Sequence, residues 1–218
     1  MKGQNVKNVA GLPVLGITGG VGAGKSTVLT CLRERYGALV LECDQIGREL
    51  QEKGGACYEA MRTLFGDGIL DSEKNIDRSR VAEMIYREPA LREQLNGLIH
   101  PAVKAEVIRR LEEAGKEYPF AAVEAALLLE DRYDEICDEI WYIHTDRDVR
   151  IRRLMASRGY TAEKCELIMA AQKPEVYYRS RCQLTVDNSG DDPAQAWEQI
   201  DRGLKEHGFL QHWQREQR

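Results

Sequence analysis

Nine residues, 19–27, carry the clearest chemical signal in the sequence, because they match the pattern G-x-x-x-x-G-K-[S/T] from Gly19 to Ser26. Glycines at these spacings let successive backbone N–H groups turn into one concavity that binds phosphate oxygens. We therefore expect ATP at this loop, with Lys25 reaching its β- and γ-phosphates and the Ser26 hydroxyl binding magnesium. The residues expected to contact the nucleotide are Gly19, Gly20, Val21, Gly22, Ala23, Gly24, Lys25, Ser26 and Thr27.

The alternative for this stretch is a glycine-rich turn without a ligand, and the flanking sequence argues against it. Residues 14–17 form a short apolar run, which predicts a strand. Residues 25–36 carry Val28, Leu29 and Leu32 at helical spacing. A strand, a loop and a helix in this order are the context that a phosphate-binding loop requires.

A second set of acidic side chains follows the next apolar run. Residues 38–41 predict a buried parallel strand, and Glu42, Cys43 and Asp44 come directly after it. Ligands of open α/β sheets bind beyond the carboxyl ends of the strands. If the strand alternation continues, Glu42 and Asp44 lie on the same side, beside the phosphates. We expect Asp44 to accept the proton of an attacking hydroxyl and Glu42 to orient water or magnesium.

Five arginines are clustered between residues 147 and 158, at positions 147, 150, 152, 153 and 158. A run of charges usually forms a solvated helix face. Arginine side chains also match phosphate oxygens, and phosphoryl transfer needs cations over the γ-phosphate. We therefore expect residues 147–172 to form a lid, with Arg153 acting in catalysis and Arg158 assisting it.

Four further residues have both a functional and a structural interpretation. His100 precedes Pro101 at a predicted helix boundary, where it contacts the acceptor or serves as a structural hydrogen-bonding group. Arg48 is a candidate clamp for a phosphate of the acceptor. Glu124 and Glu130 flank an apolar stretch and either orient the acceptor and magnesium-bound water or lie at the surface. We assign Arg48, His100 and Glu124 to acceptor binding.

The remaining elements predict an α/β fold, a P-loop NTPase-type doubly wound parallel sheet with a helical insertion and a lid. Residues 120–123, 139–143 and 183–186 predict strands, and Asp192 and Pro193 begin a final helix. Between residues 46 and 100 only helical patterns occur, including residues 91–99. A separate helix is expected after Pro101. We expect residues 1–45, 101–146 and 173–218 to form the nucleotide-binding core, and residues 46–100 to form the acceptor-binding insertion.

Composition narrows the class of protein. The 218 residues carry a net charge of −5, whereas a general nucleic-acid binder is basic. The six cysteines form no C-x-x-C pair and have no histidine at zinc spacing, so we expect reduced thiols in a cytoplasmic protein. The polar first 13 residues lack the apolar segment of a signal peptide, and no stretch of about 18 apolar residues occurs. We therefore expect neither a nucleic-acid nor a membrane partner, and the oligomeric state is left open.

The ordered set of motifs resembles the dephospho-CoA kinase family over residues 14–190. The matching stretches are residues 17–28, Asp44 with Ile46 and Arg48, residues 98–101, 127–130, 153–155 and 186–190. The resemblance implies ATP with Mg²⁺ as the phosphoryl donor, the ribose 3′-hydroxyl of dephospho-CoA as acceptor, and Asp44 as general base. The chain departs from the family pattern at Glu42, at Ala126 with Leu129, at Ile168 and at Cys182 with Gln183.

Two other functions remain open at this point. One is a P-loop kinase acting on another small hydroxylated metabolite or nucleotide. The other is a nucleotide-dependent switch, because residues 44–47 fit the D-x-x-G element that senses a γ-phosphate. The chain contains no N/T-K-x-D motif for reading guanine, which disfavours the switch.

Overall fold

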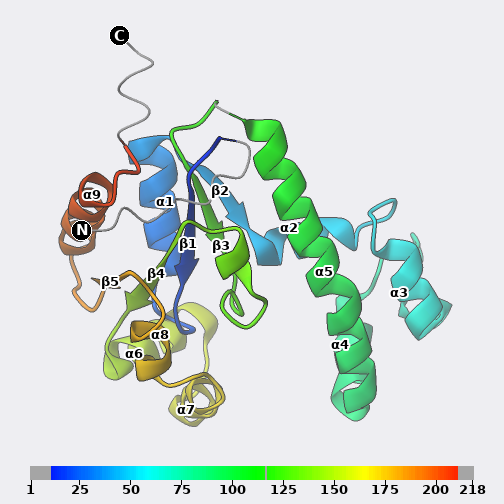
Figure 1. Cartoon of the computed structure of the whole chain (residues 1–218). Coiled ribbons are helices and arrows are strands. Elements are labelled where there is room, and N and C mark those ends of the chain that lie inside the picture. The colour runs from blue at the N-terminus through cyan, green and yellow to red at the C-terminus, as the bar shows by residue number, and fades with distance from the viewer. Residues whose placement is uncertain (1–10, 116, 211–218) are drawn as a thin grey trace. The chain divides into compact units, whose positions relative to one another are not determined.

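The computed structural model describes residues 11–115 and 117–210, so most of the expectation about a signal peptide lies outside the described residues. The chain divides into two compact units. The first combines the residues up to Leu41 with those from Leu111 onward, and the second is Glu42–Arg110. Figure 1 shows the course of the chain through both.

The first unit is built on a five-stranded sheet in the order β2-β3-β1-β4-β5. The strands are β1 (Val14–Thr18), β2 (Leu39–Glu42), β3 (Ala121–Glu124), β4 (Glu139–His144) and β5 (Leu184–Asp187). Strand β1 pairs in parallel with β3 and β4, and β4 pairs in parallel with β5. The expected parallel α/β sheet is confirmed, and each predicted strand lies within two residues of its observed position.

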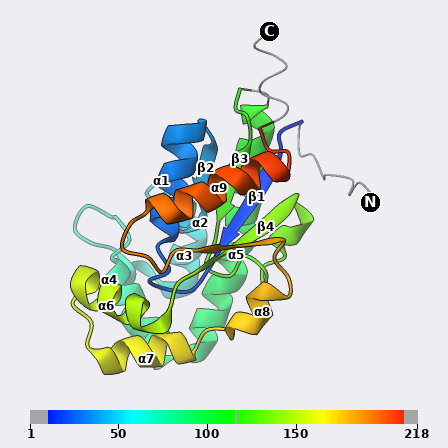
Figure 2. The same cartoon turned by 90° about the vertical axis from the view of Figure 1, so that its left-hand side faces the viewer.

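Helices α1 (Lys25–Tyr36) and α9 (Ala194–Glu206) lie side by side over one face of this sheet (Figures 1 and 2). Alternation along the strands directs one set of side chains into the core beneath them. That core includes Leu15, Ile17, Trp141, Ile143, Val28, Leu32, Ile200 and Leu204. The Tyr36 hydroxyl donates to Asp201 at 3.1 Å and links the two helices at the surface.

The other face of the sheet packs against different segments. A Cβ at Gly16 would lie 3.1 Å from the Cys137 sulfur and 3.3 Å from Leu128, in the segment that follows β3. Tyr178 of α8 (Glu175–Arg179) stacks on Tyr142 of β4 with ring centroids 5.0 Å apart. Both faces of the sheet are therefore covered, as the doubly wound class requires.

The predicted arginine segment forms two helices, α6 (Arg147–Arg158) and α7 (Ala162–Ala170). Gly159 ends α6 with a positive φ of 62°, and the Thr161 hydroxyl caps α7 by accepting the Lys164 N–H. Arg147 of α6 forms an ion pair with Glu166 of α7, so exposed charges join the two helices.

The second unit contains α2 (Cys43–Leu50), α3 (Tyr58–Phe65), the short η1 (Asp67–Ile69), α4 (Arg78–Arg87) and most of α5 (Pro89–Ala114). It has a core of its own around Met61, Phe65, Ile69 and Val81, joined by apolar side chains of α5. Asp77 caps α4 by accepting the N–H groups of Ser79 and Arg80. This unit is helical apart from one isolated bridge between Leu70 and Ile76.

Two local predictions in the second unit are wrong. The helix break expected at His100 and Pro101 does not occur, because α5 runs through both residues. Proline in a helix crowds the carbonyl group four residues earlier. That residue is Gly97, and a glycine allows the backbone there to adjust more freely than other residues do.

The second wrong prediction concerns the end of the strand that precedes Asp44. Strand β2 ends at Glu42 and α2 begins at Cys43, so Asp44 lies in the first turn of a helix. The alternation that was expected to place Glu42 and Asp44 on one side of a strand therefore does not apply. An acidic residue in the first turn of a helix interacts favourably with the helix dipole, which favours this early start.

All six cysteines are free thiols, and five of them are buried. Cys182 is partly buried, and this desolvation raises the pKa of its thiol to about 12. In the part of the chain that the structure describes, no helix is both long and apolar enough to cross a bilayer.

Gly203 offers a test of the packing between α9 and the sheet. A Cβ there would lie 2.6 Å from Leu184 and 2.8 Å from the fully buried Trp141. We expect Gly203→Ala to lower the free energy of unfolding by about 1–3 kcal/mol through overpacking, measured by urea unfolding. Arg202→Ala, on the exposed side of the same helix, is the control and should stay within about 0.5 kcal/mol. A Gly203→Ala protein as stable as wild type would contradict this packing.

Candidate active site

The glycine-rich loop leaves β1 after Thr18 and leads directly into α1. Gly22 and Gly24 have positive φ angles of 76° and 79°, which glycine adopts without strain. The Ala23 N–H donates to the Gly20 carbonyl at 3.1 Å and tightens the turn. Because α1 begins at Lys25, the unpaired N–H groups of its first turn open onto the same loop.

Side chains bind every second carbonyl group of the loop. The Lys25 ammonium donates to Gly19 at 2.9 Å, and Arg150 Nε donates to Val21 at 2.8 Å. The Ala23 carbonyl accepts from Asn188 Nδ2 at 2.9 Å and from the Thr145 hydroxyl at 3.0 Å. These contacts fix the direction of the loop's peptide groups, which is what a preformed anion site needs.

The loop glycines also allow neighbouring groups to approach closely. A Cβ at Gly20 would lie 2.4 Å from an Arg150 nitrogen, and a Cβ at Gly24 would lie 2.3 Å from Asn188 Nδ2. A Cβ at Gly22 would meet Leu154 at 3.0 Å. Gly22 and Gly24 therefore combine a positive φ with close neighbours, whereas Gly20 leaves room for the Arg150 guanidinium without needing a positive φ.

Lys25 also faces a carboxylate. Its Nζ lies 3.5 Å from Glu124 Oε1 at the end of β3, and both side chains are largely buried. The structure thus brings together two residues to which the sequence assigned different roles, Lys25 toward the nucleotide and Glu124 toward the acceptor. Glu130 lies apart from this pair, near enough to Tyr178 to contribute to the raised pKa of that phenol, which burial chiefly causes.

The arginines of the predicted lid fall into two groups. Arg153 lies beside the loop: one nitrogen donates to the Gly190 carbonyl at 3.0 Å, and its Nη1 would lie 3.4 Å from a Cβ at Gly24. Its other terminal nitrogen is buried and has no hydrogen-bond partner among the described residues. Arg158 is exposed and lies over the Tyr160 ring, and Arg147 pairs with Glu166. Arg153 therefore has donor capacity directed at the loop, whereas Arg147 and Arg158 are engaged on α6 and α7.

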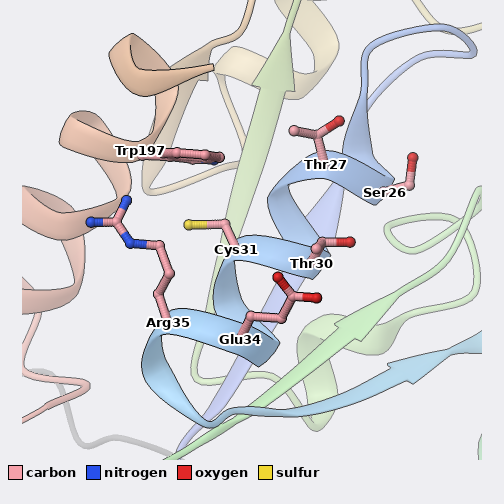
Figure 3. Close-up of a pocket in the computed structure, with 7 residues that line it drawn as sticks. All are labelled: Ser26, Thr27, Thr30, Cys31, Glu34, Arg35 and Trp197. Carbon is pink, nitrogen blue, oxygen red and sulfur yellow. The ribbon is translucent and has the colours of Figure 1, made fainter.

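A pocket of about 340 Å³ lies along α1 beside the loop (Figure 3). It is lined by Ser26, Thr27, Thr30, Cys31, Glu34, Arg35 and Trp197. The Arg35 guanidinium lies over the Trp197 ring at 5.1 Å. Ser26 and Thr27 belong both to the motif and to this pocket, so the loop opens toward it.

The expected acceptor residues Asp44, Arg48 and His100 belong to the second unit. Asp44 and Arg48 are exposed one turn apart on α2, and His100 is partly exposed on α5. The two helices approach closely where a Cβ at Gly47 would lie 3.4 Å from Val103. A pair between Glu49 and Arg110, 2.6 Å apart, also joins them.

The structure reveals loop contacts that sequence reasoning missed. Residues 186–190 matched the family pattern without an assigned role, but Asn188 is buried and holds the Ala23 carbonyl. Thr145 carried no interpretable signal, and Gln172 was only the last residue of the predicted lid, yet both bind the loop. Gln172 accepts the Val21 N–H at 3.1 Å.

The residues present fit a magnesium ion. Magnesium binds through few protein oxygens and keeps its waters and substrate phosphates as the other ligands. Ser26 supplies an exposed hydroxyl in the first turn of α1. Within residues 11–115 and 117–210, no cluster of three or more acidic, histidine or cysteine side chains could hold a metal ion.

Comparison with known proteins gives consistent matches. A family model described as dephospho-CoA kinase matches residues 13–193. A dephospho-CoA kinase of Geobacter sulfurreducens is 34% identical over 194 residues, which cover 88% of this chain and 95% of the relative. One of Streptococcus agalactiae is 33% identical over 178 residues, covering 82% and 91%. The crystal structure of TT1252 from Thermus thermophilus has a TM-score of 0.77 at 26% identity, covering 90% and 97%.

Substituting the glycines at the two ends of α1 distinguishes the cost of backbone strain from the cost of disturbing the packing of the loop. Gly24 and Gly37 both have positive φ, but only Gly24 has a neighbour that a Cβ would displace. We expect Gly37→Ala to cost about 1–2 kcal/mol of stability and leave ATP affinity unchanged. Gly24→Ala should cost more and weaken ATP binding at least tenfold, because Asn188 loses its place on the loop. Calorimetric titration with ATP measures this, and equal affinities of the two variants would contradict it.

Proposed function

The chain belongs to the dephospho-CoA kinase family, and from this membership we propose that it transfers the γ-phosphoryl group of ATP to the ribose 3′-hydroxyl of dephospho-CoA. The product is coenzyme A, so the reaction is the last step of its biosynthesis. The observation that carries the proposal is the loop between β1 and α1, whose carbonyls are bound by side chains and whose Lys25 lies beside Glu124.

Lys25 acts on the transferred phosphoryl group in this proposal. A loose phosphoryl transfer develops charge on the phosphate oxygens, and a fixed cation stabilises that charge. Lys25 is fixed by the Gly19 carbonyl and by Glu124. Arg153, with a buried donor near the loop, is proposed to add a second cation, and Arg158 a third.

Ser26 is proposed to hold Mg²⁺ together with the nucleotide. When bound, the ion neutralises the β- and γ-phosphates. The support is the Ser26 hydroxyl, which is exposed in the first turn of α1 where the motif places a magnesium ligand. Thr27 and the pocket along α1 are proposed to accommodate the nucleoside, since both continue from the loop.

Asp44 is proposed as the general base and Glu42 as a residue that orients water or the ion. The support is the resemblance at Asp44 and its position two residues after β2 ends. A carboxylate is a weak base toward a hydroxyl in the ground state. In a loose transition state the hydroxyl loses its proton late, so accepting the proton there is sufficient.

The acceptor is proposed to bind through Arg48, His100 and Glu124, with residues 46–100 as the acceptor-binding part. Residues 1–45, 101–146 and 173–218 then form the nucleotide core, and residues 147–172 the lid. The separate core of Glu42–Arg110 supports an independent binding part. A cytoplasmic location, with two small-molecule substrates and neither nucleic acid nor membrane as partner, is supported by the free thiols and the net charge of −5.

Conversion of dephospho-CoA to coenzyme A, followed by mass spectrometry, tests the function. We expect a mass increase of one phosphoryl group that requires ATP and is lost on chelation of magnesium by EDTA. Lys25→Met, which keeps the length of the side chain and removes its charge, should lower turnover by several orders of magnitude without unfolding the protein. Nucleoside monophosphates and shikimate are the comparison acceptors. Faster transfer to either would show that the acceptor is wrong.

The two acids at the end of β2 are distinguished by amide substitutions that preserve shape. Asp44→Asn should lower turnover by about 10²-fold or more with little change in ATP affinity, as expected for loss of a general base. Glu42→Gln should cost clearly less. If Glu42→Gln is the more damaging change in folded protein, the base has been assigned to the wrong residue.

A further inference from the structure

Both backbone polar groups of Val21 are bound by two side chains that also bind each other. Arg150 Nε donates to the Val21 carbonyl at 2.8 Å, and the Val21 N–H donates to Gln172 Oε1 at 3.1 Å. Arg150 Nη2 donates to the same Gln172 oxygen at 2.7 Å. The three residues form a closed ring of hydrogen bonds, which joins α6 and the segment after α7 to the middle of the loop.

Arg150 brings a positive charge to the loop without a negative partner. Both acceptors that bind it, the Val21 carbonyl and the Gln172 amide, are uncharged. Among the described residues no carboxylate forms an ion pair with it. Burial lowers the pKa of Arg150, but an arginine remains protonated at neutral pH. A cation held in this way stays uncompensated until an anion approaches.

Two nearby acids contact other side chains rather than Arg150. Asp146 and Glu175 line the same polar pocket of about 170 Å³ as Arg150 and Gln172. Each lies 3.4 Å from a ring nitrogen of His144, and Glu175 also pairs with Arg179. Gly20 of the phosphate-binding loop lies directly against the Arg150 guanidinium, so the positive charge is in contact with the loop itself.

We propose that Arg150 and Gln172 are positioning residues for the nucleotide: Gln172 fixes the Val21 peptide groups, and Arg150 adds an uncompensated charge behind the loop that strengthens polyphosphate binding. This inference rests on the proposed function, because it assumes that the loop binds ATP. In this proposal both side chains act through the loop rather than by contacting the phosphates. At an effective dielectric constant of about 20, a unit charge within roughly 12 Å of an anionic charge changes anion affinity by about tenfold or more.

Three substitutions separate the two effects. Arg150→Met removes the charge and keeps most of the volume. Gln172→Glu keeps an acceptor for both donors but places a negative charge against Arg150. Gln172→Leu removes the acceptor and leaves the charge of Arg150 in place. Ala156→Glu adds a negative charge on an exposed position of α6 and serves as the control.

The measurements are the dissociation constants of ATP and ADP by calorimetry without acceptor, and the melting temperature of each protein. Arg150→Met and Gln172→Glu should weaken ATP binding about tenfold and ADP binding less, since the effect grows with the charge of the ligand. Gln172→Glu should also raise the melting temperature, because it pairs a buried cation. Gln172→Leu should weaken both nucleotides to a similar degree.

A stability gain together with an affinity loss is a signature that a merely structural role does not produce. The inference is wrong if Arg150→Met and Gln172→Glu leave both constants within twofold of wild type. The inference is also wrong if these two variants leave the ratio of ATP affinity to ADP affinity unchanged. It is equally wrong if the control Ala156→Glu changes that ratio as much as they do. In turnover assays the KM for ATP should rise while the KM for dephospho-CoA stays the same.

Failure of the proposed function gives a different pattern. If the wild-type protein binds no ATP, the assignment of the loop as an ATP site is wrong, and the inference about Arg150 and Gln172 fails with it. If the wild-type protein binds ATP and produces coenzyme A while Arg150→Met binds ATP equally well, only the role of Arg150 is refuted.

Discussion

The structure of the nucleotide loop depends on side chains that hold its carbonyl groups. A loop of backbone N–H groups attracts anions only if the carbonyls of the same peptides point elsewhere. Here the carbonyls of Gly19, Val21 and Ala23 are each bound by a side chain from outside the turn or from α1. Each such bond contributes modestly, about 0.5–1.5 kcal/mol, but together they select one conformation of a glycine-rich segment. These bonds therefore hold the loop in one conformation and leave its N–H groups to bind an anion.

The order of the strands brings the side chains that surround the loop to one edge of the sheet. Strand β1 lies between β3 and β4, and β5 follows β4. Glu124 ends β3, while Thr145 and Asn188 come directly after β4 and β5, so all three lie at the carboxyl edge where the loop begins. The same order places Trp141 of β4 beneath α9, against Gly203. The core and the site are thus fixed by one arrangement of strands.

Local patterns predicted the elements well and the contacts poorly. Apolar runs and helical spacing identified β1, α1 and the final helix, because these signals reside in neighbouring residues. The start of α2 at Cys43 and the continuity of α5 through Pro101 were missed, since they depend on packing and on the freedom of Gly97. The motif predicted Lys25 in the loop, but nothing near Asn188 in the sequence indicates that it binds Ala23. Contacts across more than a hundred residues leave no local pattern.

Lys25 and Arg150 differ in how strongly each one attracts an anion to the loop. Lys25 already has a counter-charge in Glu124, 3.5 Å away in a largely buried pair. A phosphate that binds Lys25 exchanges one negative partner for another, so part of the attraction is offset by the loss of that pair. Arg150 has only uncharged partners, and its attraction for an anion is not offset in this way. In the proposed function the paired Lys25 would therefore give direction to the bound phosphate, whereas Arg150, which has only uncharged partners, would give affinity.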